Sequence, residues 1–212
     1  MHKHKYMPLW HIRTLLLSLL FLSSTLSAQE DYSLRIAYGK ATTTDLGEVL
    51  GGYIKDYEVD YNVLAFDGGY LVGKEIYDLP IDIYVKAGLA YFAQTGLQND
   101  ILESTLYIKA YWNIDFLENR VRVGFGEGLS YTSNILMPEY LDAELKNDNN
   151  SHLLNYLDIS VDVDFGRLIG YKPLYSTAIG VAIKHRSGVF SLFNNVSHGG
   201  SNYNTFYIEK NF

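Results

Sequence analysis

Residues 81–91 read IDIYVKAGLAY, and their polarity alternates with a period of two residues. Side chains of an extended chain project alternately to its two faces. Ile81 and Ile83 therefore lie on one face of a strand, and Asp82 and Lys86 lie on the other. A segment with one continuous apolar face and one polar face favours a β-sheet whose two sides meet different surroundings.

The same alternation recurs along the chain and predicts strands over residues 32–42, 56–73, 80–94, 101–115, 120–133, 152–165, 174–187 and 202–212. Short connections alternate with longer, more polar ones, as is typical of outer-membrane barrels. The polar faces mix Lys, Arg and Asp with Gly and Ser, which suits a narrow lumen filled by ion pairs. A bilayer requires a closed sheet, because every backbone polar group must be paired internally. We therefore predict an all-β fold, an eight-stranded antiparallel transmembrane β-barrel of the Gram-negative outer membrane.

Residues 1–28 are typical of a secretory signal peptide. They combine a basic start, an apolar run over residues 15–22 and a small-residue cut site ending at Ala28. The run is shorter than the roughly 20 apolar residues of a spanning helix, and an uncleaved anchor is the alternative. Residues 29–212 then form a single barrel domain. The chain has no cysteine, which excludes thiolate catalysis and a lipoprotein anchor, and its 17 basic against 24 acidic residues exclude a nucleic-acid partner.

Two acidic features of the predicted strands need an explanation. Glu127 falls on an outward, apolar face, where a charge within a membrane is costly. A bulge over residues 124–128 could turn it inward, and the register there is open. Asp158, Asp162 and Asp164 share one face at a period of two residues. They are either a cation site or partners of Lys and Arg across the lumen, and ion pairing is the expectation.

The end of the chain places chemically useful groups on one outward face. His185 and Ser187 share a face of their strand at a Cα spacing of about 7 Å, and Asn202 begins the next strand at the same height. Acyl transfer needs a nucleophile, a base and a group that orients the base. Ser187 could serve as the nucleophile, His185 as the base and Asn202 as the orienting group. Main-chain N–H groups of Gly199 and Gly200 could stabilise an oxyanion. The alternative is that His185, Arg186 and Ser187 are simply polar residues at the rim where the strand leaves the membrane.

The segment from His185-x-Ser187 to Phe212 resembles the C-terminal signature of the PagL-type lipid A 3-O-deacylases, a family of eight-stranded outer-membrane barrels. In that family the His and Ser of H-x-S are base and nucleophile, and an acidic residue orients the His. The resemblance therefore implies His185 as base and Ser187 as nucleophile. This chain has Asn202 at the position of the acidic residue, and Gly188 where the family often has Asn.

The resemblance implies a serine esterase that removes the 3-linked hydroxyacyl chain of lipid A, with no metal or cofactor. Lipid A or lipopolysaccharide would be its substrate, and outer-membrane lipid would surround it. Glu139, Asp142 or Glu144 of the long loop is an alternative orienting acid. The rival function is a non-catalytic small barrel, an OmpX-like scaffold, adhesin or stress protein that works through its loops. The oligomeric state is open, a homodimer included.

Overall fold

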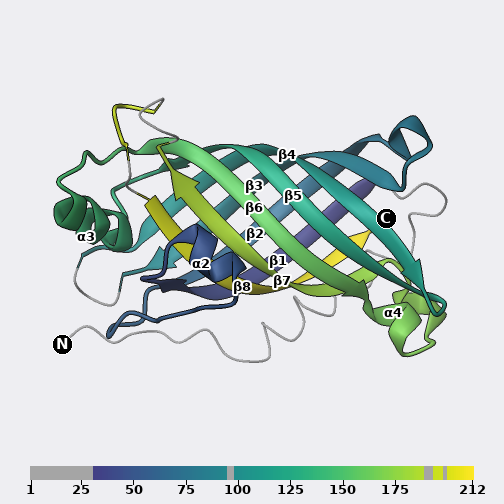
Figure 1. Cartoon of the computed structure of the whole chain (residues 1–212). Coiled ribbons are helices and arrows are strands. Elements are labelled where there is room, and N and C mark those ends of the chain that lie inside the picture. Colours follow the sequence, from purple (N-terminus) through teal and green to yellow (C-terminus); the bar gives the residue numbers. More distant parts are fainter. Residues whose placement is uncertain (1–30, 95–97, 189–192, 198–199) are drawn as a thin grey trace, which may run out of the picture.

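The computed structural model describes residues 31–94, 98–188, 193–197 and 200–212, which form one closed antiparallel barrel (Figure 1). Each strand pairs with the next in the chain, and the first pairs with the last. The predicted eight-stranded antiparallel barrel is confirmed, whereas the expected signal peptide, residues 1–28, lies outside the described residues. The strands are β1 (Tyr32–Thr42), β2 (Asn62–Gly73), β3 (Ile81–Ala93), β4 (Ile101–Phe116), β5 (Asn119–Thr132), β6 (Leu153–Asp164), β7 (Thr177–Ser187) and β8 (Gly200–Asn211).

Short helices lie at the two ends of the barrel (Figure 1). The end that we call the loop end carries α2 (Leu46–Leu50) and α3 (Met137–Lys146). The opposite end, called the turn end, carries η1 (Ile76–Asp78), α4 (Phe165–Leu168) and η2 (Lys172–Leu174). None of the helices in the described part of the chain is long and apolar enough to cross a membrane.

The outside of the barrel is apolar and the inside is polar. On β4, Leu106 and Ile108 are each 59% exposed, whereas their neighbours Tyr107 and Lys109 are buried in the lumen. This alternation follows from the period of two residues in a strand. It is the reverse of a soluble barrel, whose interior would hold the apolar side chains. The wall therefore presents to its surroundings the surface that a bilayer requires.

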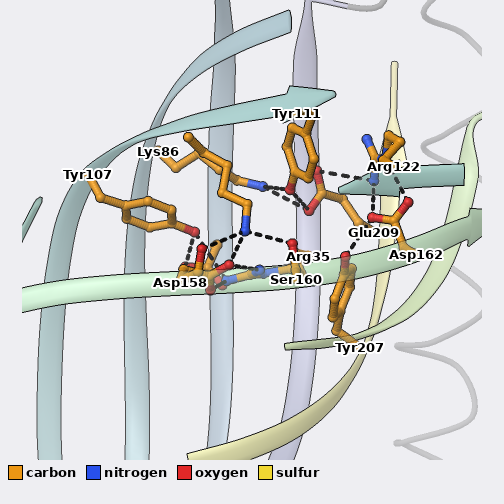
Figure 2. Close-up of polar contacts among 12 residues, drawn as sticks. Arg35, Lys86, Tyr107, Tyr111, Arg122, Asp158, Ser160, Asp162, Tyr207 and Glu209 are labelled. Carbon is orange, nitrogen blue, oxygen red and sulfur yellow. Dashed lines mark hydrogen bonds and ion pairs between the residues drawn. The ribbon is translucent and has the colours of Figure 1, made fainter. Parts of the chain in front are cut away.

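Ion pairs fill the lumen, as Figure 2 shows. The Arg35 guanidinium donates to Asp67 at 3.0 Å and to Asp158 at 2.6 Å, and the Lys86 ammonium lies 2.8 Å from a Glu209 oxygen. All five side chains are at least nine-tenths buried. A buried charge is costly unless it is paired, so these contacts make the predicted polar lumen compatible with a closed, narrow barrel.

The acidic face of β6 has partners on neighbouring strands. Asp158 contacts Arg35, and Asp162 accepts two hydrogen bonds of 2.8 Å from Arg122 (Figure 2). Asp164 caps α4, since its carboxylate accepts from the Arg167 N–H at 2.9 Å. The expected ion pairing is confirmed for Asp158 and Asp162. Asp164 also lies 3.4 Å from Arg167 Nε, but this partner is local rather than across the lumen, and Asp164 caps α4 as well.

β5 has no bulge over residues 124–128. β5 pairs with β4 and with β6 without a shift of register, so Glu127 stays on the outward face. Gly124 and Gly126 leave room for the Lys109 side chain in the lumen. A Cβ at these positions would lie 2.6 and 2.9 Å from carbons of the Lys109 side chain. Glu127 instead lines a cavity at the loop end.

β2 begins later than expected, at Asn62 rather than at residue 56. The Thr43 N–H donates to the Lys55 carbonyl at 2.9 Å, and Thr42 pairs with Asp56 in an isolated bridge. These bonds close the β1–β2 loop upon itself, so residues 57–61 connect the bridge to β2. The loop carries α2 and lies against the outside of the barrel wall (Figure 1).

Candidate active site

Strand register gathers the predicted residues on the outward face at the loop end. His185 of β7 pairs with Asn202 of β8, and Ser187 pairs with Gly200. On the other side of β7, Ser187 pairs with Asn155 of β6. Because residues two apart on a strand share a face, His185 and Ser187 project from the same side as Asn202 and Asn155. The structure thus brings together the three residues that the sequence singled out.

A hydrogen bond joins His185 to Asn202. His185 Nδ1 lies 2.7 Å from Asn202 Oδ1, and Asn202 Nδ2 donates to the Thr44 carbonyl at 2.8 Å. A carbonyl oxygen only accepts, so the Asn202 amide must present its NH₂ to Thr44 and its oxygen to His185. His185 Nδ1 therefore carries the proton, and Nε2 keeps a free lone pair. This is the tautomer that a general base requires.

Ser187 is half-buried and lies one outward position beyond His185. Within the described residues its hydroxyl makes no hydrogen bond. Nucleophile–base contacts are often long before substrate binds, and they shorten in the complex. The arrangement therefore offers an unengaged hydroxyl beside a base whose tautomer is fixed.

The predicted oxyanion groups have different outcomes. Gly199 lies outside the described residues, whereas Gly200 is the first residue of β8 and stands opposite Ser187. Sequence analysis missed Asn155, which is 6% exposed and lines the same cavity as Ser187. The sequence pattern that could have indicated Asn155 is a polar residue at an outward position of a strand face that is otherwise apolar. Glu127 of the neighbouring strand β5 is likewise a polar residue at an outward position.

The cavity around His185 and Ser187 has a volume of about 480 Å³, within the range of ligand-binding pockets. Its rim comes from the β1–β2 loop and α3, where Lys146 forms ion pairs with Asp142 at 2.9 Å and Asp45 at 3.4 Å. Burial, followed by nearby Asp142, raises the pKa of Tyr57 to about 12. The Tyr57 hydroxyl therefore remains protonated and can donate a hydrogen bond at this rim.

The acids of the long loop have other partners. Glu139 points into the mouth of the barrel, where it accepts from Arg186 at 2.5 Å and from Ser201 at 2.8 Å. Asp142 pairs with Lys146, and Glu144 accepts from the Tyr140 hydroxyl at 2.5 Å. In the described part of the chain, none of these three acids is hydrogen-bonded to His185. Asn202 alone of the proposed orienting groups contacts the ring.

A second, apolar groove of about 480 Å³ lies on the barrel wall next to the cavity. On the strand side the two are neighbours, since Ile183 of the groove lies one outward position from His185 of the cavity, and Ile159 lies one outward position from Leu157. The other side of the groove is the β1–β2 loop, with Val49 and Leu50 of α2. The groove thus lies between α2 and the outside of β6, β7 and β8.

The described residues contain no group of three or more His, Asp or Glu side chains arranged to hold a metal ion. The lining of the cavity includes hydroxyl, imidazole and amide groups, with carboxylates and the Lys146 ammonium beside them. Such a set carries out nucleophilic and acid–base steps.

Comparison with solved structures finds barrels that are similar in fold to this chain. The crystal structure of the outer membrane enzyme PagL matches with a TM-score of 0.58 and 12% sequence identity, over 85% of this chain and 99% of that chain. Neisserial surface protein A matches with a TM-score of 0.48 and 11% identity, over 88% and 100% of the two chains. No protein-family model and no curated protein matches the sequence. At this identity the likeness to PagL shows a common fold, that of an eight-stranded outer-membrane barrel.

Proposed function

We propose that this chain is an outer-membrane serine esterase that hydrolyses the 3-linked hydroxyacyl ester of lipid A. The observation that carries the proposal is the chain of hydrogen bonds from the Thr44 carbonyl through Asn202 to His185, which leaves a lone pair on Nε2 of a ring that shares its strand face with Ser187. Ser187 is the nucleophile, His185 the general base and Asn202 the orienting residue. The H-x-S resemblance in the sequence and the fold shared with an outer membrane enzyme support the same assignment.

The reaction proceeds in two halves. Ser187 Oγ attacks the ester carbonyl carbon while His185 Nε2 takes the hydroxyl proton. The intermediate collapses, the sugar oxygen leaves with the proton from His185, and the acyl group remains on Ser187. Water then attacks the acyl-enzyme, giving its proton to His185, and the fatty acid leaves as Ser187 regains a proton. Asn202 remains neutral and holds the ring through both halves.

The apolar groove supplies a place for the acyl chain. Ile183 and Val181 of β7 line it on the wall side, and Val49 of α2 lines it on the loop side. A chain that moves into the groove from a bilayer gains little hydrophobic free energy, because lipid tails are as apolar as the groove. Its contribution is therefore orientation, which holds the ester carbonyl near Ser187 and lowers the entropic part of the barrier.

The position of the site on the outside of the barrel fits a lipid substrate. His185 and Ser187 face away from the lumen, on a wall whose outward side chains are mostly apolar. A lipid in the same leaflet could reach them by lateral diffusion, without leaving the membrane. We place the loop end, with α2 and α3, toward the outer leaflet and the lipopolysaccharide.

Mass spectrometry of lipid A tests the proposal. The chain is expressed in a Gram-negative host, and lipid A is compared with that from cells expressing Ser187→Ala. We expect loss of one hydroxyacyl mass with the wild type, no loss with Ser187→Ala, and wild-type behaviour with Ser104→Ala, which removes an exposed outward hydroxyl on β4. Heat-modifiable migration on gels verifies that each barrel is folded. Unchanged lipid A with a folded wild-type barrel would refute the proposal and favour the non-catalytic barrel.

A further inference from the structure

Asn155 is the polar residue directly across from Ser187. The two residues are register partners on β6 and β7, so their Cβ atoms lie roughly 4.5–5.5 Å apart. The other register partner of Asn155 is Leu129 of β5. Asn155 is on the outward face, yet it is only 6% exposed, because the loop end covers this part of the wall. An amide in this position is held beside the nucleophile and shielded from bulk solvent.

The Asn155 amide makes no hydrogen bond within the described residues, and it lines the cavity shared with His185 and Ser187. Its nitrogen and oxygen are not among the unpaired side-chain atoms sealed from solvent in the described part of the chain, so the amide opens onto the cavity. An amide without a protein partner that faces a cavity is suited to bind a polar atom of a ligand.

The residue that follows Ser187 cannot provide such a donor from a side chain. Gly188 packs against the β7–β8 loop, and a Cβ there would lie 2.0 Å from the Val196 carbonyl oxygen. His185 occupies the neighbouring outward position along β7, where it acts as the base. Of the two register partners of Ser187, Gly200 has no side chain, and Asn155 carries an amide that can donate.

We propose that the side-chain N–H of Asn155 donates a hydrogen bond to the oxyanion that forms when Ser187 attacks the ester; this role rests on the proposed function. As the Oγ–carbon bond forms, the carbonyl π electrons move to oxygen and the Ser187 proton moves to His185. The oxyanion accepts from Asn155 Nδ2, and no proton is transferred. When the carbonyl re-forms, the bond to the leaving oxygen breaks, and Asn155 returns to its initial state.

The test measures kcat and KM separately, with the purified barrel and lipid A in mixed detergent micelles. Removing one oxyanion donor lowers kcat by about 10²–10³-fold. We expect Asn155→Ala to show that loss with KM unchanged. Asn155→Asp has the same shape but no N–H at this position, and it should lose at least as much. Ser104→Ala is the matched control for an outward polar residue far from the site and should retain wild-type constants.

Three results would overturn the role of Asn155. The first is an Asn155→Ala enzyme whose kcat stays within about twofold of wild type. The second is a raised KM with kcat retained, which would make Asn155 a ground-state binding residue. The third is a wild-type barrel that is folded but hydrolyses no lipid A, in which case the proposed function fails as well. Wild-type activity thus separates the two failures, and Asn155→Asp decides the question if Asn155→Ala does not fold.

Discussion

Asn202 Oδ1 accepts a hydrogen bond from His185 Nδ1 at 2.7 Å, while Asn202 Nδ2 donates to the Thr44 carbonyl at 2.8 Å. The β1–β2 loop therefore determines which way the Asn202 amide faces, and the amide determines the His185 tautomer. A neutral amide gives less stabilisation to an imidazolium than a carboxylate would, because it carries no charge. The main effect of Asn202 on His185 is therefore to orient the imidazole ring.

Substitution of Asn202 should impair catalysis through the imidazole. In Asn202→Ala the ring loses its partner and can rotate or change tautomer, and a misplaced catalytic group costs about 10²-fold in rate. We expect that loss in kcat, together with a ¹⁵N spectrum of His185 that no longer shows a single Nδ1–H tautomer. Asn202→Asp keeps an acceptor for Nδ1 and should retain more activity than Asn202→Ala. An unchanged spectrum and rate in Asn202→Ala would contradict the orienting role.

The apolar groove should select acyl chains by length. Ile183→Trp places a larger side chain directly below His185, so we expect slower hydrolysis of long acyl chains relative to short ones. The measurement is the ratio of kcat/KM for a long-chain and a short-chain ester in the same micelles. Ile108→Trp, on the exposed wall of β4, is the control and should leave the ratio unchanged. A ratio that is equally unaffected by Ile183→Trp would show that the chain binds elsewhere.

Breaking a lumen ion pair should destabilise the barrel. Glu209→Gln leaves the Lys86 ammonium, which is fully buried, without its carboxylate, and the expected loss is about 3–5 kcal/mol of unfolding free energy. Urea unfolding in detergent, followed by heat-modifiable migration, measures it. The exposed Lys40–Asp60 pair provides the matched control, and Asp60→Asn should leave the free energy of unfolding nearly unchanged, because solvent screens an exposed pair. If both variants lost a similar amount of unfolding free energy, burial of the Lys86–Glu209 pair would not be the reason for the loss.

Glu139 should connect α3 to the catalytic strands. Its carboxylate binds Arg186 and Ser201, which are the chain neighbours of His185 and Asn202 on the inward face. Glu139→Gln removes the charge from a buried pair, and we expect a loss of roughly 3 kcal/mol or more with faster amide exchange at the loop ends of β7 and β8. Glu144→Gln, on an exposed part of the same helix, should change neither. Slow exchange retained in Glu139→Gln would indicate that α3 does not hold these strand ends.

The period-two pattern was sufficient to predict the barrel and the faces of most strands. Polarity that alternates along a strand is a local property, so Ile81 and Lys86 could be assigned to the two faces directly from the chain. His185, Ser187 and Asn202 were placed on one face for the same reason. Gly124 and Gly126 of β5 also fall at inward positions of the pattern. The physical reason for glycine there is the space taken by Lys109, which lies on the neighbouring strand β4 and could not be read from the sequence around the glycines.

The sequence by itself thus determined the barrel, its inverted polarity and the outward placement of His185 and Ser187. Only the tertiary structure decided that Asn155 stands beside Ser187, that Glu139 enters the lumen and that Thr44 fixes the Asn202 amide. The physical reason is that strand pairing and loop packing join residues far apart in the chain. A side chain's face can be read from its neighbours in sequence, but its partner depends on register and on how the loops fold over the wall.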